Sequence, residues 1–424
     1  MNINMNNYII TAAALGTCST LYHLYQWYRS SPTTTSFLLL NDSDVAAALP
    51  VNLAIQIQNQ AFQDQYNNIA VVPERIVMSL PSYNGATLFK PCFNAHPSRT
   101  ALGLKVVSTR PNNKTLSLPT VPATIMMFEP STGLPSAVLN GTYLTALRTA
   151  GGSGVATNMF AKPDATVLSV FGAGMQAKAH IDCILSVRPS ITTLYIVNRT
   201  LSRATTLKKY VLAKHGCNVH VLKQATYDSV HNADVICTTT NSSTPLFDGR
   251  WLSSNTHINA IGSYTPAMQE LDACTVEQCC IYIDTPHALS CGDLSMANVT
   301  KERHGLMTLG QACTMPREQL QRTLGPRERS GGGKGNDVKK HSKRFSMILN
   351  EIQQEGTLHG APVSPRAANS SASGTEKRSA KETVLVLECI TLFKSVGTSI
   401  QDIATAAVVV ARAKKMGIGT QVFM

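Results

Sequence analysis

The stretch Thr166–Ala177, TVLSVFGAGMQA, decides the fold of this chain of 424 residues. A short apolar run leads into two closely spaced glycines. The residues after them carry apolar side chains at helical spacing, with Ala177, Ile181 and Ile184 on one face. A strand, a tight glycine turn and a helix in this order open a dinucleotide-binding fold. The alternative is an ordinary tight turn before a helix, but further strands and helices follow in the same alternation.

Each small residue of the turn has its own role in binding a dinucleotide. Gly172 allows the chain to turn, Gly174 allows the backbone to approach a pyrophosphate, and Ala177 allows the helix to pack closely on the strand. The start of the helix, with Met175 and Gln176, presents free N–H groups and a partial positive charge to the phosphates. These five residues are therefore predicted to bind the cofactor.

The composition indicates a globular protein without a nucleic-acid partner. The net charge is +12, but residues 322–381 hold twelve Lys or Arg and five Asp or Glu, which accounts for seven of those charges. That segment is rich in Gly and Ser and is expected to be a low-complexity insertion. The remainder is mildly basic, which suits an anionic ligand. The eleven cysteines show no metal-binding spacing, so we expect no metal site and a reducing compartment.

Residues 1–36 form an extension before the first domain. Within it, residues 8–28 lack Asp, Glu, Lys and Arg over 21 positions, about the length needed to span a bilayer. Polar residues lower the mean hydropathy of this segment, and no charged region precedes it. We therefore expect a cytoplasmic protein, with membrane anchoring through residues 8–28 as the alternative.

Periodic patterns divide the rest of the chain. Strand patterns separated by turn residues predict a mostly antiparallel sheet in residues 37–142. Apolar strands that alternate with helices predict a doubly wound, Rossmann-like parallel sheet in residues 143–315. Residues 316–382 form the low-complexity basic insertion, and one strand and one long helix follow in residues 383–424. The predicted fold class is therefore α/β, with an α+β part.

The motifs of the ordered regions resemble those of the ornithine cyclodeaminase/mu-crystallin family. The matching motifs occur in the family's order and are Gly141–Ala150 with Arg148, Gly172–Ala177, Asn198-Arg199-Thr200, Ala233–Ile236, Trp251, His257–Gly262, Glu270-Leu271-Asp272, Gly292-Asp293, Phe393–Gly397 and Asp402. They lie in residues 37–315 and 383–424, so the extension and the insertion fall outside the resemblance.

The resemblance implies a split architecture. Residues 37–142 and 383–424 would form one substrate-binding and dimerisation domain, so a homodimer is expected, and residues 143–315 would bind NAD(H) or NADP(H). Family members interconvert small amino acids and imines, by cyclising deamination of ornithine, dehydrogenation of alanine, or reduction of cyclic ketimines and pyrroline carboxylates. The expected substrate is therefore a small imino or amino acid.

The end of the second strand of the parallel sheet bears on the choice of cofactor. An NAD site has an acidic residue there, about 20 residues beyond the glycine turn, to bind the ribose 2′-hydroxyl. Here the position reads Asn198-Arg199-Thr200, without an acid, and Arg199 can pair with a 2′-phosphate. NADP(H) is therefore favoured over NAD(H), unless Arg199 points into solvent. The resemblance adds four predicted cofactor-binding residues, Thr238, Thr239, Ile261 and Gly262.

Three cations match family positions that bind the substrate carboxylate. Arg148, on the helix before the glycine turn, suits a bidentate carboxylate clamp. Arg75 and Lys105 match two further positions, and Lys105 is also a catalytic candidate. For each cation alone, the alternative is a surface ion pair. Lys90 stands where the family usually has an apolar residue, so we expect it to reshape the pocket.

The chain departs from the family pattern at one catalytic position. Ornithine-cyclising members carry an aspartate two residues after the glycine of the Asn-Ala-x-Gly motif, where this chain has Tyr264. A tyrosine with an ordinary pKa of about 10 stays protonated at neutral pH and cannot supply the carboxylate charge. Ornithine cyclodeamination is therefore not expected. Tyr264 could instead donate a proton or hold a ring nitrogen, as a second catalytic candidate, or it could simply line the pocket.

These features predict an NADPH-dependent reductase that transfers hydride to the C=N carbon of a small cyclic imino acid, such as a pyrroline- or piperideine-2-carboxylate. Two alternatives stay open. One is a lyase that resembles ornithine cyclodeaminase and acts on another amino acid. The other is a non-enzymatic, mu-crystallin-like protein that binds a ligand together with NADPH.

Overall fold

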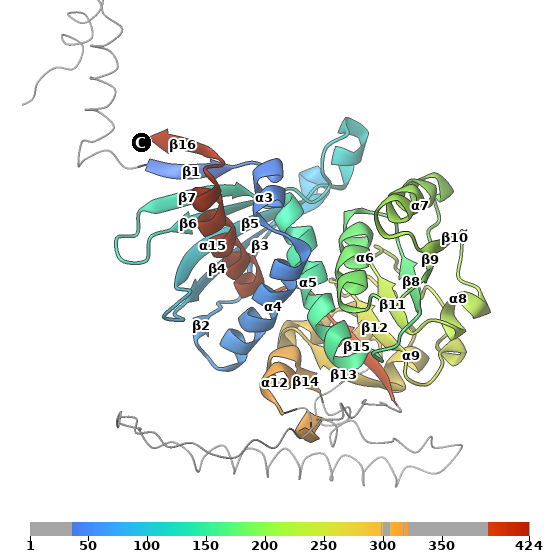
Figure 1. Ribbon diagram of the computed structural model, residues 1–424. Coiled ribbons are helices and arrows are strands. Elements are labelled where there is room, and N and C mark those ends of the chain that lie inside the picture. The colour runs from blue at the N-terminus through green and yellow to red at the C-terminus, as the bar shows by residue number, and fades with distance from the viewer. Residues whose placement is uncertain (1–35, 298, 300–305, 317, 321–388, 424) are drawn as a thin grey trace, which may run out of the picture. The chain divides into compact units, whose positions relative to one another are not determined.

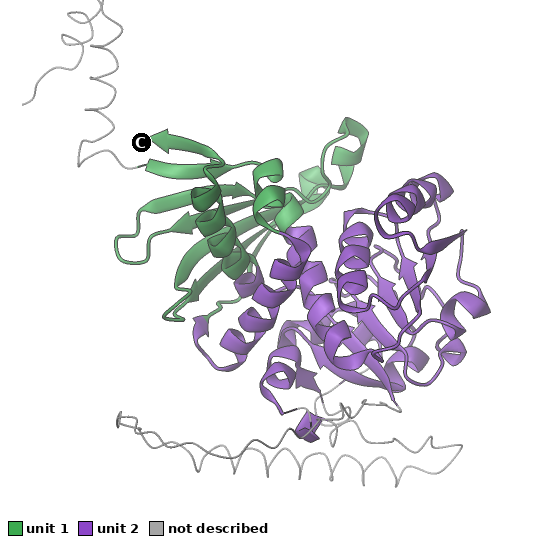
Figure 2. Cartoon of the chain, in the orientation of Figure 1, with its two compact units in different colours: residues 1–49, 71–144, 402–424 green, residues 50–70, 145–401 purple. Residues whose placement is uncertain are grey.

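Two compact units make up the part of the chain that the computed structural model describes (Figure 1, Figure 2). The described residues are 36–297, 299, 306–316, 318–320 and 389–423. Unit 1 comprises the described residues of 1–49, 71–144 and 402–424, and unit 2 comprises those of 50–70 and 145–401. The chain passes from one unit to the other four times: between residues 49 and 50, between residues 70 and 71, and within helices α5 (Thr142–Phe160) and α15 (Ser399–Met416).

No helix in these ranges combines the length and the apolar character that crossing a bilayer requires. Residues 8–28, the possible anchor considered above, and nearly all of the insertion lie outside the described residues.

Unit 1 contains an eight-stranded sheet that is mostly antiparallel, as predicted. Its strands are β1 (Ser36–Leu40), β2 (Ala70–Val71), β3 (Ile76–Leu80), β4 (Gly85–Asn94), β5 (Ala101–Thr109), β6 (Ala123–Phe128), β7 (Pro135–Asn140) and β16 (Thr420–Phe423). They follow the order β16-β1-β7-β6-β5-β4-β2, and β3 pairs with β4. Strands β1 and β7 run parallel, whereas β4, β5, β6 and β7 form an antiparallel meander.

Helix α15 packs on one face of this sheet because a strand residue beneath it has no side chain. A Cβ at Gly103 of β5 would lie 2.8 Å from Ile403 Cδ1 of α15. The helix ends at Gly417, whose φ of +65° suits a left-handed cap. Helix α3 (Asp42–Ala48) begins with a reciprocal capping box, in which Asn41 and Asp44 each accept a 3.0 Å hydrogen bond from the other's backbone N–H.

Unit 2 contains the predicted doubly wound sheet, with eight parallel strands. The strands are β8 (Val167–Phe171), β9 (Thr193–Val197), β10 (Asn218–Leu222), β11 (Val235–Thr238), β12 (His257–Ala260), β13 (Cys279–Ile283), β14 (Met307–Thr308) and β15 (Ile390–Lys394), in the order β10-β9-β8-β11-β12-β15-β13-β14. The other helices of this unit are α4 (Val51–Tyr66), α6 (Met175–Val187), α7 (Leu201–His215), α8 (Tyr227–His231), α9 (Ala273–Glu277), α10 (Gly292–Ser295) and α12 (Leu309–Thr314).

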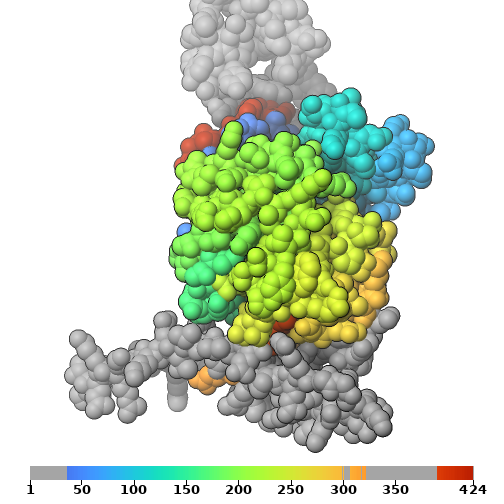
Figure 3. All heavy atoms as spheres, turned by 90° about the vertical axis from the view of Figure 1, so that its right-hand side faces the viewer, coloured from blue at the N-terminus to red at the C-terminus, as the bar shows by residue number. Residues whose placement is uncertain are grey.

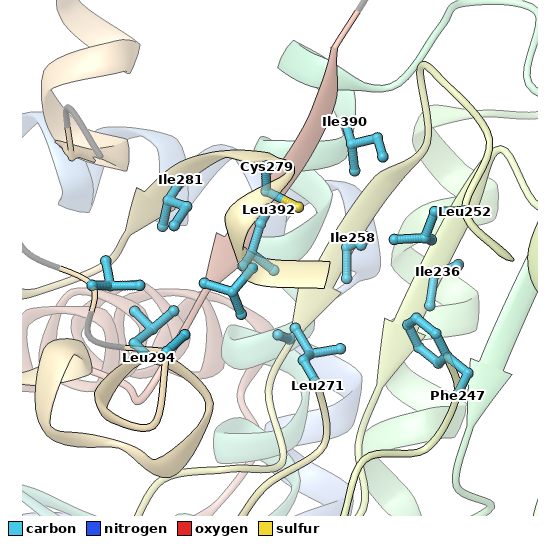
Figure 4. Close-up of a cluster of buried hydrophobic side chains, with 14 of the residues drawn as sticks. Ile236, Phe247, Leu252, Ile258, Leu271, Cys279, Ile281, Leu294, Ile390 and Leu392 are labelled. Atoms are coloured by element: carbon cyan, nitrogen blue, oxygen red, sulfur yellow. The ribbon is translucent and has the colours of Figure 1, made fainter. Parts of the chain in front are cut away.

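Alternating side chains of the strands build a core on each face of the parallel sheet. On one face, α6 and α7 bury apolar residues such as Ile181 and Leu207 against Leu168 of β8. On the other face, residues of β11, β12, β13 and β15 pack with side chains that follow the strands, including Phe247 and Leu271 (Figure 4). Helix α7 lies at the outer side of the unit, which faces the viewer in Figure 3.

Two segments belong to a different unit from the one that the sequence analysis assigned. Residues 50–70 and the described residues 389–401 lie in unit 2, not with the antiparallel sheet. Strand β15 inserts between β12 and β13, with Leu392 opposite both Ile258 and Ile281, and all five of its residues are buried. A strand buried on both faces suits the interior of a parallel sheet. Helix α4 packs on α12, where a Cβ at Gly310 would lie 2.4 Å from the carbonyl oxygen of Phe62.

Two histidines of unit 2 are buried in its interior. Nδ1 of His257, on β12, lies 2.9 Å from Thr391 Oγ1 of β15, and the ring lies beside Phe160. Burial lowers the pKa of His257 to about 3 and that of His180, on α6, to about 4. Both side chains are therefore neutral in the folded protein at physiological pH.

This burial predicts that the protein loses stability on mild acidification. An unfolded histidine, with a pKa near 6.5, takes up a proton that the folded form excludes, so the free energy of unfolding falls as pH drops below about 6.5. One such group costs up to about 1.4 kcal/mol per pH unit until its folded pKa is reached. Urea unfolding at several pH values should show this slope, and His257→Gln should reduce it. A slope that is the same in the wild type and in His257→Gln would contradict the conclusion that His257 is neutral in the folded protein.

Candidate functional site

The turn after β8 contains two glycines, and the two positions favour glycine for different reasons. Gly172 has φ of +114°, and a Cβ there would lie 2.6 Å from Thr239 Oγ1, so the fold itself requires glycine. Gly174 is the exposed N-cap of α6 with an extended backbone, and a Cβ there would meet nothing within 4 Å. Ala177 is fully buried beneath the turn. Open space therefore lies beside Gly174, at the start of the helix.

The N-terminus of α6 fits a pyrophosphate. The first helical hydrogen bond runs from Lys178 N to Gly174 O, at 3.1 Å, so the N–H groups of residues 175–177 have no partner within the helix. Met175 is 51% exposed, and Gln176 is half-buried. Free N–H groups and the positive end of the helix dipole are the features that bind anionic phosphates.

The carboxyl end of β9 is cationic and lacks acids. Asn198 donates from its side chain to Thr200 O at 2.8 Å, which orders the segment before α7. Arg199 between them is exposed and makes no hydrogen bond or ion pair with another described residue. Lys223, also exposed, follows β10 at the same edge, because Leu222 pairs with Val197. No Asp or Glu occurs from residue 198 to residue 227.

The carboxyl ends of β11 and β12 adjoin the glycine turn. Thr239 donates to Phe171 O from both its backbone N–H and its hydroxyl, each at 2.9 Å. Ile261 donates its N–H to Thr238 O at 3.0 Å. The predicted cofactor residues Thr238, Thr239, Ile261 and Gly262 therefore lie together at the edge where a doubly wound sheet binds its ligand.

A buried carboxylate organises this edge. Glu270, fully buried, accepts hydrogen bonds from Thr238 Oγ1 (2.7 Å), Thr240 N (2.6 Å), Thr240 Oγ1 (2.7 Å) and Gly262 N (2.7 Å). Burial and the Asp293 carboxylate raise the pKa of Glu270, Lys394 and the threonine hydroxyls oppose that rise, and the net pKa is raised. In the sequence Glu270 is only one residue of a motif, because nothing in its neighbours reveals these four donors.

A buried ion pair lies directly behind Glu270. Asp293 accepts the backbone N–H groups of Glu270 (2.6 Å) and Leu271 (3.0 Å) on one oxygen and Lys394 Nζ (2.8 Å) on the other. Asp293 and Lys394 are both buried. Burial lowers the pKa of Lys394, but the carboxylates of Asp293 and Glu270 together with Cys291 raise it more, so the net pKa is raised and the ammonium stays charged.

Arg148, on α5, lies against the loop that follows β15. Its guanidinium is 5% exposed and donates from Nη1 to Gln401 Oε1 at 3.1 Å. Gly397 has φ of +79°, and a Cβ there would lie 2.8 Å from both Nη1 and Nη2. Glycine at this position therefore lets the guanidinium rest directly on the backbone.

The loop itself is held by one carboxylate. Asp284 Oδ2 accepts from Ser395 Oγ (2.8 Å), Val396 N (2.9 Å) and Gly397 N (2.6 Å). The loop begins after Lys394, at the carboxyl end of the sheet, because Lys394 pairs with Ala260 and Ile283. Arg148 is therefore held at the same edge as the predicted cofactor residues.

Tyr264 follows β12 at this edge. The side chain is 44% exposed and makes no hydrogen bond with another described residue. Partial burial raises its pKa above the usual value of 10, so the phenol is protonated at neutral pH. The side chain can donate a proton but cannot act as a resident anion.

The other predicted substrate residues belong to unit 1. Lys105 of β5 is buried and donates to Asp402 Oδ1 at 2.8 Å, and Lys90 of β4 lies 3.3 Å from Asp402 Oδ2. Lys90 pairs across the sheet with Lys105, and Arg75 precedes Ile76, whose partner Phe89 precedes Lys90. The three cations therefore lie in one row across β3, β4 and β5.

Comparison with known proteins agrees with this architecture. The family model of the ornithine cyclodeaminase/mu-crystallin family matches residues 35–318. The chain is 34% identical over 234 residues to a delta(1)-pyrroline-2-carboxylate reductase of Bacillus cereus, covering 55% of this chain and 70% of that protein. It is 32% identical over 216 residues to the ketimine reductase mu-crystallin of Mus musculus, covering 51% and 66%. These matches leave about a third of each relative uncovered.

A solved structure extends the similarity over most of the chain. The structure of Thermococcus litoralis delta(1)-pyrroline-2-carboxylate reductase in complex with NADH and L-proline has a TM-score of 0.70 and 26% identity, and it covers 91% of this chain and 100% of that one. A doubly wound dinucleotide-binding unit joined to a mostly antiparallel sheet defines this class of protein. The chain belongs to the ornithine cyclodeaminase/mu-crystallin family.

The two glycines of the turn provide a matched pair of variants. Gly172→Ala should lower the free energy of unfolding by roughly 1–3 kcal/mol, because the new side chain meets Thr239 and is strained at positive φ. Gly174→Ala should leave thermal stability nearly unchanged but weaken dinucleotide binding about tenfold or more, because its methyl group enters the space proposed for the pyrophosphate. Thermal unfolding and calorimetric titration measure the two effects. Equal effects of both variants on binding and stability would refute this distinction.

Proposed function

We propose that this protein is an NADPH-dependent reductase of small cyclic imino acids whose C=N carbon carries a carboxylate. The observation that carries the proposal is the buried Arg148 guanidinium, held against Gly397 at the ligand-binding edge of a dinucleotide-binding sheet. A cation in that place binds a carboxylate next to the reacting carbon and leaves that carbon available to the nicotinamide.

The cofactor is assigned from the cationic end of β9. The glycine turn and the N-terminus of α6 would hold the pyrophosphate, and Arg199, with Lys223 beside it, would bind a 2′-phosphate. The absence of acids from residue 198 to residue 227 leaves no carboxylate to bind a free ribose 2′-hydroxyl and favours NADPH over NADH. When bound, NADPH supplies the hydride.

The chain's own residues account for the rest of the reaction. Arg148 would orient the imine through its carboxylate, so that the electron pair of the C=N bond moves to the nitrogen when hydride adds to the carbon. A protonated imine then yields a neutral secondary amine, which takes one further proton. Tyr264, protonated at neutral pH, is the proposed donor of that proton or of a hydrogen bond to the ring nitrogen.

Unit 1 offers further cations for an anionic substrate. Arg75, Lys90 and Lys105 lie in one row by the register of the strands, and Asp402 forms ion pairs with Lys90 and Lys105. We propose that Arg75 and Lys105 contribute to binding the substrate carboxylate and that Lys90 alters substrate preference.

The reductases among the relatives support the reaction type. The Bacillus cereus and Thermococcus litoralis proteins are named as pyrroline-2-carboxylate reductases and the mouse protein as a ketimine reductase. Tyr264, in the position of the aspartate of ornithine-cyclising members, supports reduction over cyclodeamination.

The direct test is turnover of the purified protein with NADPH and a cyclic imino acid. Loss of the near-ultraviolet absorbance of NADPH on adding pyrroline- or piperideine-2-carboxylate supports the proposal. Release of ammonia from ornithine or another amino acid with bound cofactor and no net oxidation would overturn it in favour of the lyase. Tight NADPH binding without any turnover would point to a ligand-binding protein instead.

Removal of the Arg199 side chain should change the choice between coenzymes. Arg199→Ala should weaken NADPH binding by about tenfold or more while changing NADH binding little, because only NADPH carries the 2′-phosphate. The control is Lys209→Ala, which removes one cation from an exposed position of α7 and should change the affinity for neither NADPH nor NADH. Equal losses for both coenzymes in Arg199→Ala would contradict the proposed contact.

Arg148→Met should weaken substrate binding and leave cofactor binding nearly unchanged. Loss of a buried charge-assisted contact of about 1.5–3 kcal/mol should raise KM or lower kcat/KM for the imino acid by roughly 10- to 100-fold. Calorimetric affinity for NADPH should stay within about twofold of the wild type. A variant that binds the imino acid normally would remove Arg148 from the substrate site.

We also propose that the protein is a homodimer formed through unit 1. Ile76, Val77 and Met78 of β3 are 64%, 58% and 50% exposed, an apolar run that a second copy of the chain would cover. Sedimentation of the full chain should show a dimer, and Val77→Lys should shift it toward monomer. A wild-type monomer at micromolar concentration would refute this assembly.

A further inference from the structure

Three charged side chains are buried together at the ligand-binding edge of unit 2. Glu270, Asp293 and Lys394 are all nearly inaccessible to solvent. Asp293 and Lys394 form an ion pair at 2.8 Å and neutralise each other. If Glu270 is ionised, the cluster therefore carries one net negative charge, and burial prevents water from screening it as it would on the surface.

The hydrogen bonds around Glu270 place a backbone donor on each oxygen of its carboxyl group. Oε1 accepts the backbone N–H of Thr240 at 2.6 Å, and Oε2 accepts the backbone N–H of Gly262 at 2.7 Å. Backbone N–H groups only donate, and two threonine hydroxyls approach the same two oxygens. Donors on both oxygens favour the charged form of a buried carboxyl group.

The position of this carboxylate relates it to the nicotinamide end of a dinucleotide. A doubly wound sheet binds the adenosine half over the strands on the β9 side of β8 and the nicotinamide half over those on the β11 side. Glu270 joins the ends of β11 and β12, through Thr238 and Gly262. A Cβ at Gly262 would lie 2.4 Å from Glu270 Oε1, so the carboxylate lies directly behind the backbone of that residue.

We propose that ionised Glu270, held by Thr240 and Gly262 and backed by the Asp293–Lys394 pair, stabilises the cationic, oxidised nicotinamide relative to the neutral, reduced one. The inference rests on the proposed binding of a nicotinamide cofactor and deepens it. Hydride loss converts the neutral dihydronicotinamide into a pyridinium cation, so a fixed anion nearby makes the bound cofactor a stronger hydride donor. Glu270 lies behind the backbone of Gly262 and would act through its charge, as a positioning residue.

The test compares the affinities of the oxidised and reduced coenzyme, without turnover. In Glu270→Gln, which keeps the size of the side chain, the ratio Kd(NADP+)/Kd(NADPH) should rise about tenfold. A tenfold change equals about 30 mV in the potential of a two-electron couple. Asp293→Asn, which leaves the four hydrogen bonds to Glu270 in place, should shift the ratio in the same direction. A purely structural role would weaken both coenzymes equally.

The matched control is a carboxylate at the opposite edge of the same sheet. Asp234 precedes β11 and accepts the backbone N–H groups of Thr166 (2.6 Å) and Val167 (3.0 Å). Asp234→Asn should lower thermal stability and leave the ratio unchanged. An unchanged or lowered ratio in folded Glu270→Gln and Asp293→Asn would overturn the proposal.

A measurement on the wild-type protein decides the question if these variants fail to fold. A dinucleotide phosphate with neutral benzamide in place of nicotinamide differs from NADP+ mainly in ring charge. The wild-type protein should bind NADP+ about tenfold more tightly, and equal or tighter binding of the benzamide analogue would overturn the inference. All titrations are repeated with the 2′-dephosphorylated coenzymes. Failure to bind either coenzyme would refute the proposed function itself, whereas binding without charge preference refutes only the role of Glu270.

Discussion

The ion pair between Lys394 and Asp293 is the interaction on which the rest of unit 2 depends. Lys394 ends β15, a strand that comes from the far C-terminal part of the chain and lies between β12 and β13. Its ammonium fixes Asp293, which in turn holds the backbone at Glu270. Removing one partner of a buried pair leaves an uncompensated charge, a loss of about 3–5 kcal/mol. The pair therefore couples the insertion of β15 to the shape of the ligand-binding edge.

The same strand also positions Arg148, the cation proposed to bind the substrate. The loop after Lys394 is clamped by Asp284 and ends in Gly397, on which the Arg148 guanidinium rests. One five-residue strand thus positions both the cation proposed for the substrate carboxylate and the anion proposed to act on the nicotinamide. Opposite charges of this kind would suit hydride transfer to an imino acid, because the substrate brings an anion and the cofactor becomes a cation.

Local features of the sequence predicted most of the fold correctly. The apolar run before Gly172 and the helical spacing after it specify strand, turn and helix without help from distant residues, and the structure confirms all three. The placement of β15 could not be predicted in this way. The strand is too short for its pattern alone to assign it to one sheet, and its partners lie more than 100 residues away. Only the tertiary pairing of the strand decides which of the two sheets it joins.

In the candidate site, too, some features could be predicted from the local sequence and others depend on distant residues. Arg199 could be named from its distance to the glycine turn, and Arg148 from its place in a motif that resembles the family's. The roles of Glu270 and Asp293 depend on donors from several separate segments, and no pattern along the chain reveals such a network. The sequence marks Lys90 as unusual, but its ion pair with Asp402 depends on helix α15, which lies more than 300 residues away along the chain.

In the proposed reaction, hydride passes from NADPH to the carboxylate-bearing carbon of a cyclic imine. The most direct measurement uses NADPH deuterated on both faces of C4, with pyrroline-2-carboxylate as the acceptor and mass spectrometry of the product. The expected product is proline with one deuterium, on the carbon that carries the carboxylate. Proline without deuterium, or no proline at all, would contradict it.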